Sequence, residues 1–339
     1  MRILVTGGAG FIGSQFVRLT LHDHPGDCVV VLDKFTYAGN RRNLEDAGDL
    51  ARLRVIEGDV AIRDDVKTAL RGCDAVVNFA AETHVDRSLE DADSFLRTDV
   101  VGALVLLEAA RGAGVERFVQ VSTDEVYGDV LTGRSREDDP LRPRSPYSAS
   151  KAGAEMLVWA YRASHGYPAM VTRGSNTYGH HQFPEKIIPL FVVNALEGLP
   201  LPLYGDGSAA RDYIHVDDHA RGIDTVLRHG MPATDYNIGQ EGEEITGRDV
   251  AAAVLRLTGA PGSLLTHVLD RQGHDRRYAL DCSRLRSLGW SPRHTFETGL
   301  ADTVDWYRGN RGWWAPLRDG AYWDFYRRNY RLATGNPGD

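Results

Sequence analysis

Tyr147 and Lys151 stand four residues apart, a spacing that places both side chains on one face of a helix. An ammonium group beside a phenol lowers the pKa of the phenol and makes it a usable base near neutral pH. The spacing therefore predicts Tyr147 as a proton acceptor tuned by Lys151. Such pairs also occur by chance in many helices, so this interpretation depends on further polar residues that converge on the phenol.

Three polar residues directly follow the apolar run at 118–121 and its neighbour Ser122. Thr123 could hydrogen-bond a reacting oxygen, while Asp124 and Glu125 could act as a general acid and a general base. Used together, such a pair needs split protonation states, and we expect Asp124 to be neutral and Glu125 ionised. An Asp-Glu pair more often opens a solvated loop, but its position beside the predicted crevice favours chemistry.

A glycine-rich turn links the apolar run at 3–5 to a helical pattern. Gly7, Gly10 and Gly13 permit a tight turn whose backbone N–H groups approach a pyrophosphate at the positive end of the helix. Asp33 lies twenty residues after Gly13. Its carboxylate would accept hydrogen bonds from ribose hydroxyls and repel a 2′-phosphate, which favours NAD over NADP.

The elements that must position these residues follow from five apolar runs, at residues 3–5, 29–32, 53–56, 75–79 and 118–121. Continuous apolar runs separated by helix-length segments, such as 95–110, indicate parallel strands buried on both faces. The pattern predicts an α/β fold with a doubly wound (Rossmann) parallel sheet. Ligands bind such sheets at the carboxyl ends of the strands, so the glycine turn, Thr123 and Tyr147 would converge on one crevice.

After about residue 173 the sequence becomes irregular and rich in proline and glycine. This composition predicts a smaller C-terminal substrate-binding lobe. We expect a dinucleotide-binding domain at 1–175 and a substrate lobe at 176–339, with residues at about 210–240 returning to the main domain. Residues 254–257 and 303–307 indicate short amphipathic helices of the lobe.

Composition excludes several other classes of function. The 339 residues carry a net charge of −8, which argues against a nucleic-acid or anionic-membrane partner. The three cysteines have no metal-binding spacing, and the pair His180-His181 lacks a carboxylate or cysteine at a supporting spacing, so we expect no metal. No apolar run approaches the ~20 residues of a membrane span. The first apolar run begins too early for a signal peptide, so we expect a cytoplasmic protein.

Long segments of the chain resemble the dTDP-glucose 4,6-dehydratases, a family of extended short-chain dehydrogenases/reductases. The resemblance covers essentially the whole chain and is carried by TGGAGFIGS at 6–14, AAETHVDRS at 80–88, STDEVYG at 122–128, YSASKAGAE at 147–155, QFPEKIIPL at 182–190, PLYGDGSAARDYIHVDDHARG at 202–222 and GHDRRYALD at 273–281. It implies a hydro-lyase of deoxysugar biosynthesis that uses NAD and converts dTDP-D-glucose to dTDP-4-keto-6-deoxy-D-glucose and water. It also implies a homodimer built through residues 95–110 and 149–164.

The family mechanism assigns a role to each catalytic candidate. Tyr147 would take the proton of the sugar 4-hydroxyl as hydride passes from carbon 4 to NAD, while Thr123 bonds the oxygen and Lys151 holds the nicotinamide ribose. Glu125 would then remove the carbon 5 proton and Asp124 would protonate the departing 6-hydroxyl. Hydride would finally return to carbon 6.

The resemblance also implies which residues contact each ligand. Those expected at NAD are Gly7, Gly10, Phe11, Ile12, Gly13, Asp33, Lys34, Thr36, Asp59, Val60, Ala80, Ala81, Thr83, Thr98, Tyr147, Lys151 and Thr177. Those expected at the nucleotide sugar are His84, Thr123, Asn176, Lys186, Ile187, Pro202, Tyr204, Arg211, Asn237, Arg271, His274 and Tyr330. Arg211 is the expected ligand of the diphosphate, because a guanidinium group binds phosphate in a bidentate manner.

The chain departs from the family pattern at a few positions. Thr177, His180 and His181 replace an Asn, a Pro and a Tyr, Asp99 stands where Asn is usual, and Asn78 replaces a frequent His. None of these changes removes a group that the chemistry needs.

Three alternative functions remain open at this stage. UDP-glucose 4,6-dehydratases share much of the pattern, so the thymine base is a family inference. A 4-epimerase or a uronate decarboxylase would use the same scaffold, but Asp124 argues against both. A catalytically silent NAD-sensing regulator predicts loss of the Tyr/Lys pair or of the carboxylates, and all of these residues are present.

Overall fold

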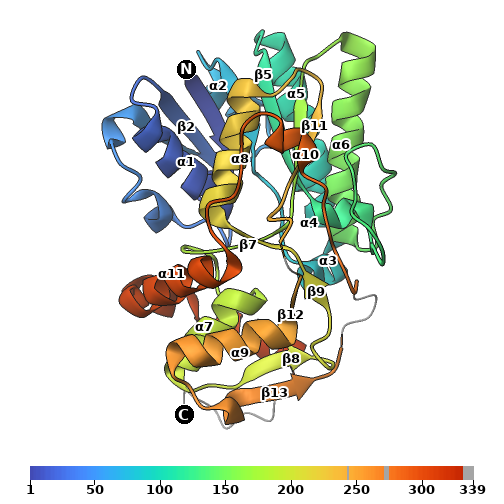
Figure 1. Ribbon diagram of the computed structural model, residues 1–339. Helices are drawn as coiled ribbons and strands as arrows, with labels where there is room; N and C mark the ends of the chain where they lie inside the picture. Colours follow the sequence, from blue (N-terminus) through green and yellow to red (C-terminus); the bar gives the residue numbers. More distant parts are fainter. Residues whose placement is uncertain (243, 271–274, 331–339) are drawn as a thin grey trace.

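A seven-stranded parallel sheet forms the centre of the larger part of the molecule (Figure 1). The computed structural model describes residues 1–242, 244–270 and 275–330. The strands lie in the order β11-β6-β5-β4-β1-β2-β3. Their bounds are β1 Arg2–Thr6, β2 Cys28–Asp33, β3 Leu53–Glu57, β4 Ala75–Asn78, β5 Arg117–Thr123, β6 Met170–Gly174 and β11 Asp235–Ile238. The predicted doubly wound fold is therefore confirmed, and the sheet contains two strands, β6 and β11, beyond the five apolar runs.

Helices cover both faces of this sheet, and strand residues alternate between the two cores. On one face, Ile3 and Val5 pack with α1 (Phe11–Asp23) and α8 (Val216–His229). On the other face, Leu4 packs with α2 (Arg63–Leu70), α5 (Gly102–Gly112) and α6 (Pro146–His165). Because both faces of the inner strands are buried, these strands read as continuous apolar runs, whereas the edge strand β3 is largely exposed.

The helix expected at 95–110 is interrupted. The chain forms α4 (Ala92–Phe95), then a wider π-helical turn, η3 (Leu96–Val101), and then α5. The π-helical turn carries Asp99, which is buried. Such turns are rare in helices and frequent at functional sites, where they re-aim side chains.

The smaller lobe lies below the sheet in Figure 1 and has a core of its own, rich in aromatic side chains. Its elements are α7 (Ile187–Glu197), α9 (Gly247–Thr258), α11 (Phe296–Gly309), α12 (Arg311–Trp314), α13 (Gly320–Tyr330) and the paired strands β8 (Leu201–Tyr204) and β13 (Leu265–Val268). The segments 254–257 and 303–307 lie within α9 and α11. In the described residues, no helix is long and apolar enough to cross a membrane.

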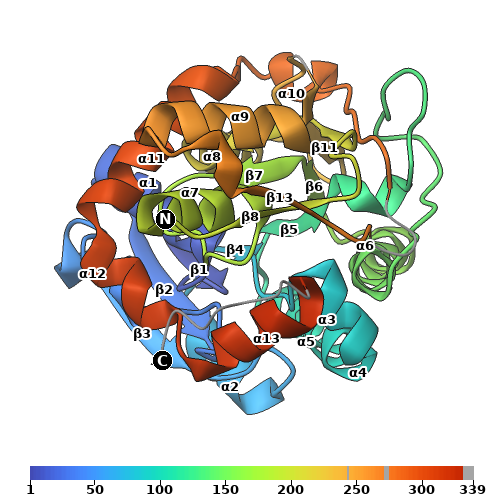
Figure 2. The same ribbon diagram turned by 90° about the horizontal axis from the view of Figure 1, so that it is seen from below.

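Short strands connect the lobe with the sheet. β7 (Asn176–Tyr178) pairs with β10 (Tyr213–His215), and β9 (Ala210–Arg211) pairs with β12 (Ile245–Thr246). From β10 the chain returns through α8 to β11 at the edge of the large sheet, and α10 (Ser283–Arg286) packs against β11. In Figure 2, α13 lies beside α3 (Val85–Glu90), where Arg87 stacks over Phe325 at 4.4 Å.

A buried ionic network joins α6 to the strands β6 and β11. Arg173 of β6 is fully buried and donates through Nε and Nη2 to Glu155 of α6, at 2.9 and 2.7 Å. Its Nη2 also reaches Asp235 of β11 at 3.3 Å. A buried guanidinium group is tolerated only when it is paired in this way, so the network fixes α6 against the sheet.

We expect Glu155→Ala to lower the free energy of unfolding by about 3–5 kcal/mol, because it leaves a buried charge with one fewer carboxylate. Urea denaturation measures the change. Glu108→Ala, which removes the half-exposed partner of Arg63, is the matched control and should cost at most about 1 kcal/mol. Equal losses in the two variants would show that Asp235 alone suffices for Arg173.

Candidate active site

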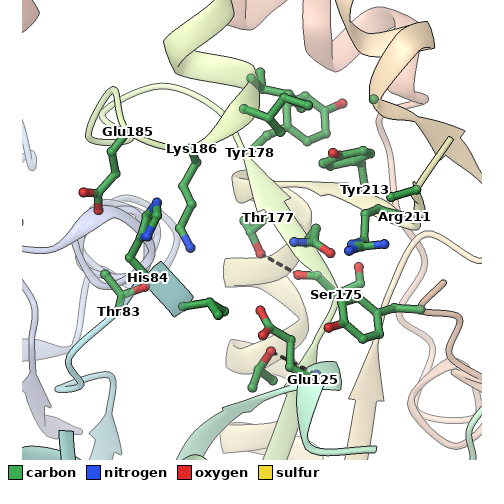
Figure 3. Close-up of a pocket in the computed structure, with 18 of the residues that line it drawn as sticks. Thr83, His84, Glu125, Ser175, Thr177, Tyr178, Glu185, Lys186, Arg211 and Tyr213 are labelled. Atoms are coloured by element: carbon green, nitrogen blue, oxygen red, sulfur yellow. Dashed lines mark hydrogen bonds between the residues drawn. The ribbon is translucent and has the colours of Figure 1, made fainter. Parts of the chain in front are cut away.

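A cavity of about 310 Å³ opens at the carboxyl ends of the strands, between the sheet and the smaller lobe. Figure 3 shows Glu125, Thr177, Lys186 and Arg211 reaching into it from separate segments of the chain. Of the predicted site residues, sixteen line the cavity: Phe11, Ile12, Thr83, His84, Thr123, Asp124, Glu125, Tyr147, Asn176, Thr177, Lys186, Ile187, Pro202, Tyr204, Arg211 and Tyr330. The structure thus brings most of the expected catalytic and sugar-binding residues to one place.

One wall of the cavity is the turn that ends β5. Thr123 caps a short 3₁₀ turn, η4 (Asp124–Tyr127), by accepting a hydrogen bond from the Glu125 backbone N–H at 3.3 Å. The Thr123 hydroxyl also donates to Asp124 Oδ1 at 3.2 Å. Asp124 is buried, whereas Glu125 is only partly buried.

Burial raises the pKa of Asp124 well above its ordinary value, and the adjacent charge of Glu125 raises it further. Arg211 opposes this effect. Within the described chain, Asp124 Oδ2 has no hydrogen-bond partner. These conditions favour the protonated form of Asp124, which is the form that a proton donor requires.

Helix α6 carries the phenol and the ammonium group. The helix begins with a capping box between Ser145 and Ser148 and with Pro146 in its first turn, which fixes the direction in which Tyr147 leaves the backbone. Lys151, one turn later, is buried and donates from Nζ to the carbonyl oxygen of Val121 at 2.8 Å. It lies beneath the cavity lining.

The predicted lowering of the Tyr147 pKa is wrong for this arrangement. Burial raises the pKa of Tyr147 well above its ordinary value, and the charges of Glu125, Asp99 and Asp124 add to this, while a hydrogen bond with Thr123 opposes it. The ammonium group of Lys151 is directed at a backbone carbonyl group, so it does not offset three carboxylates. Neutral Asp124 would remove one of the charges that oppose ionisation of the phenol.

Asp99 supports this part of the site from the π-helical turn. Its two oxygens accept hydrogen bonds from the Glu82 N–H at 3.0 Å and from the Ser150 hydroxyl at 2.5 Å. Ser150 is also 2.8 Å from the carbonyl oxygen of Tyr147. Burial raises the pKa of Asp99 to about 6, and the charge of Lys151 opposes this rise.

The glycine turn has the geometry of a phosphate cradle. A Cβ on Gly7, where φ is +67°, would lie 2.7 Å from the Ala80 nitrogen, and a Cβ on Gly13 would collide with the carbonyl oxygen of Gly7. Gly10 caps α1 without a side chain, so the N–H groups of the first turn are left for a ligand. These residues fit the pyrophosphate of NAD.

The adenosine end of the turn contains the expected acidic residues. Asp33 is buried at the end of β2 and accepts hydrogen bonds from the Ala9 and Phe35 N–H groups at 2.9 and 2.8 Å. Lys34 pairs with Asp59 at 2.9 Å. Val60 packs in the core, close to Gly102. The remaining predicted contacts in this region, Thr36, Ala80, Ala81 and Thr98, lie partly or fully exposed around it.

The opposite end of the cavity presents a cation and aromatic rings. Arg211 is buried, donates to the carbonyl oxygens of Ala210 and Asp275 at 2.8 and 2.7 Å, and stacks on the ring of Tyr278 at 4.4 Å. The rings of Tyr204 and Tyr330 lie 5.5 Å apart. This combination suits a diphosphate next to a planar base.

One predicted contact lies elsewhere, and two cannot be placed. Asn237 is fully buried on β11, where its side chain bonds Tyr127 at 2.8 Å and the carbonyl oxygen of Ser135 at 2.9 Å, so its prediction as a sugar contact is not met. Arg271 and His274 lie outside the described residues. Asn237 lies outside the segments that carry the resemblance, and the sequence could not show that its side chain is bonded to Tyr127 and Ser135.

Several lining residues were missed from the sequence. Tyr278 and Asp275 share a hydrogen bond of 2.5 Å at the Arg211 end, and Arg144 pairs with Asp275 at 2.8 Å. Asp275 and Tyr278 lie in the segment at 273–281 and His219 in the segment at 202–222, so the segments that carry the resemblance could have indicated all three. His219 is 2.7 Å from the Thr177 hydroxyl.

Comparisons with known proteins agree with this geometry. The family model described as GDP-mannose 4,6 dehydratase matches residues 4–303. The chain is 48% identical to a dTDP-glucose 4,6-dehydratase of Streptomyces niveus over 100% of this chain and 99% of the relative, and 50% identical to one of Streptomyces antibioticus over 94% and 96%. The crystal structure of DesIV, a dTDP-glucose 4,6-dehydratase from Streptomyces venezuelae with NAD and TYD bound, superposes with a TM-score of 0.90 at 52% identity, covering 94% of this chain and 100% of that one.

We expect Gly13→Ala to weaken NAD binding by roughly tenfold or more, because the added methyl group pushes the first turn of α1 away from Gly7. Titration calorimetry with NAD measures the effect. Gly112→Ala, at a helical position where a Cβ meets open space, is the control and should bind NAD as the wild type does. Unchanged affinity in Gly13→Ala would contradict the cradle.

Asp99→Asn should change how stability depends on pH. The folded chain holds the Asp99 proton up to about pH 6, whereas the unfolded chain releases it near pH 3.8. The folded state therefore loses up to about 3 kcal/mol of stability from this group as pH rises through that window. Asparagine cannot ionise, and its amide can still bond Glu82 and Ser150.

Urea unfolding at pH 4 and pH 7 measures this difference. We expect the decline between the two pH values to be smaller in Asp99→Asn than in the wild type. Asp64→Asn removes an exposed carboxylate of α2 and should keep the wild-type profile. Identical profiles in all three proteins would rule out titration of Asp99 in this range.

Proposed function

This chain belongs to the dTDP-glucose 4,6-dehydratase family, and on that premise we propose that it converts dTDP-D-glucose to dTDP-4-keto-6-deoxy-D-glucose and water. The observation that carries the proposal is the pair formed by buried Asp124 and part-buried Glu125, on the same cavity wall as Thr123 and Tyr147. A 4-epimerase needs no such acid and base pair, whereas loss of water needs both.

Each side chain has a proton to hold or move. NAD, when bound, supplies a store for the hydride that leaves carbon 4 and returns to carbon 6. Burial favours the protonated phenol, so Tyr147 must first ionise, a step that a neutral Asp124 makes easier. It can then accept the proton of the sugar 4-hydroxyl, whose oxygen Thr123 holds in place. Glu125 takes the proton of carbon 5, which the new ketone acidifies, and Asp124 gives its proton to the departing 6-hydroxyl.

The protons then balance. Glu125 returns its proton to carbon 5 when carbon 6 has become a methyl group. Tyr147 has gained one proton and Asp124 has lost one, so a single transfer between them, through solvent or product, restores the site. The raised pKa of Asp124 supports its part as the donor, since an acid that is neutral in the resting site can protonate a leaving group.

Deoxysugar biosynthesis, a homodimer and a cytoplasmic location belong to the same proposal. The side of the molecule formed by η3 and α6, which pack together, exposes the apolar side chains of Leu96, Val101 and Met156. A second copy would cover this surface with the same helices, as in a four-helix bundle. Both ligands, NAD and a nucleotide sugar, are charged metabolites of the cell interior.

The purified protein should release a 4-ketosugar from dTDP-glucose, detected by its absorbance in base, and should turn over UDP-glucose and GDP-linked hexoses more slowly. Asp124→Asn should lower kcat by roughly 100-fold or more, because the leaving hydroxyl loses its acid. In deuterated water this variant should still exchange the carbon 5 proton, whereas Glu125→Gln should lose the exchange.

Glu116→Gln changes an exposed carboxylate directly before β5 and serves as the control, with activity equal to the wild type. If Asp124→Asn eliminated water at the wild-type rate, the assignment of Asp124 as the acid would be wrong. A preference for UDP-glucose would change the nucleotide base assigned to the substrate from thymine to uracil and would leave the reaction as proposed.

A further inference from the structure

A second cluster of ligating side chains lies behind the cavity wall, where the start of α8 meets the segment leading into α11. His215 ends β10, Asp217 lies in the first turn of α8, and His294 precedes α11. One ligand atom of each residue lies within 4.8 Å of the others. Among the described residues, these three do not line the cavity; its wall residue Tyr178 separates them from it, with its ring 5.5 Å from that of His215.

We propose that His215, Asp217 and His294 form a site for one divalent transition-metal ion of the zinc class. Two imidazole nitrogens and one carboxylate are the ligands that Zn²⁺ and its neighbours in the first row prefer. Small side-chain rotations would bring the three ligand atoms from within 4.8 Å of one another to a common ion, with water completing the coordination. The site is distinct from the reaction described above.

His294 is held in the tautomer that metal binding needs. Its Nδ1 lies 2.9 Å from Oδ2 of Asp218, a fully buried carboxylate that also accepts the backbone N–H groups of Arg293 and His294 at 2.9 Å each. A carboxylate can only accept, so Nδ1 carries the proton and Nε2 keeps its lone pair. Histidine ligands of metals are usually supported by a carboxylate in this way.

His215 lacks the hydrogen bonds that a buried imidazole normally makes. Its residue is only 3% exposed, and Nε2 has no partner among the residues that the structure describes. Its Nδ1 has only a long contact of 3.4 Å with the Asp217 N–H and lies 3.7 Å from Asp217 Oδ2. Nδ1 accepts in this contact, so it carries the lone pair of the ring. With so long a hydrogen bond as its partner, that lone pair is available to a metal ion next to Asp217 Oδ2.

The His180-His181 pair explains how Asp217 is oriented. Arg18 Nη2 lies 3.2 Å from His181 Nε2, and a guanidinium group can only donate, so that nitrogen accepts. His181 Nδ1 then donates to His180 Nδ1 at 3.1 Å, which leaves the His180 proton on Nε2 to bond Asp217 Oδ1 at 3.2 Å. These two histidines, which replace Pro and Tyr of the family pattern, therefore position the carboxylate and leave its other oxygen, Oδ2, toward His215.

Zinc binding tests the proposal directly. Untagged full-length protein is stripped with EDTA, dialysed and titrated with ZnCl₂ by calorimetry. We expect about one ion per chain with a Kd in the micromolar range or tighter, and a rise of several degrees in Tm at saturating zinc. His294→Asn can keep the bond to Asp218 but lacks Nε2, so its affinity should fall by roughly tenfold or more.

His229→Asn removes an exposed histidine at the far end of α8 and should bind zinc as the wild type does. Asp217→Asn provides a second variant that keeps an oxygen for His180 and loses the charge, and it should also bind weakly. Circular dichroism and Tm in EDTA establish that each variant is folded. Co²⁺ gives an independent readout, since its visible absorption bands should appear in the wild type and in His229→Asn only.

The proposal is overturned if the wild type binds no zinc at 100 micromolar concentrations, roughly the weakest affinity compatible with a built site. It is equally overturned if His294→Asn and Asp217→Asn bind zinc and Co²⁺ as the wild type does, because the ion would then sit on other histidines. Sugar turnover does not enter these measurements, so they stand apart from the test of the dehydratase reaction.

Discussion

The burial of Asp99, Asp124 and Lys151 around the partly buried phenol of Tyr147 is the constraint on which the rest of the structure depends. Each of these groups would ionise freely in solvent, but burial penalises every charge and makes each protonation state depend on its neighbours. The fold sustains the electrostatic cost of burying these groups because separate elements hold them in place. These elements are the end of β5, the π-helical turn and the capped start of α6. Chemistry that needs one neutral acid and one basic group beside it requires such an arrangement.

The same constraint explains which parts of the fold were readable from the sequence. Strands β1, β2, β4 and β5 are largely buried on both faces, and their apolar runs identify them, while β3 at the edge is identified by Leu53, Val55 and Ile56 although it is largely exposed. Strands β6 and β11 were not predicted from apolar runs because Arg173, Asp235 and Asn237 interrupt the apolar pattern, although Arg173 and Asn237 are fully buried. Arg173 bonds Glu155 of α6 and Asp235, and Asn237 bonds Tyr127 and Ser135. A hydropathy pattern cannot register a polar residue whose partners come from distant segments.

The sequence predicted the positions of the site residues better than it predicted their pKa shifts. Spacing and segment resemblance located most of the side chains that meet at the cavity, because the carboxyl edge of a parallel sheet gathers them. Spacing could not give the pKa of Tyr147, since it reports only the neighbour along the helix. The carboxylates of Asp99 and Asp124 reach the phenol from two other segments, and their effect emerges only from the assembled fold.

The 3₁₀ turn after β5 has a consequence for how this family can vary. With about three residues per turn, consecutive side chains in such a turn point roughly 120° apart, which is why Asp124 is buried while its neighbour Glu125 is partly open. A single inserted or deleted residue ahead of the pair would rotate both side chains by a third of a turn, so neither would keep its present surroundings. The number of residues between the strand and the turn is therefore constrained together with the two residue types.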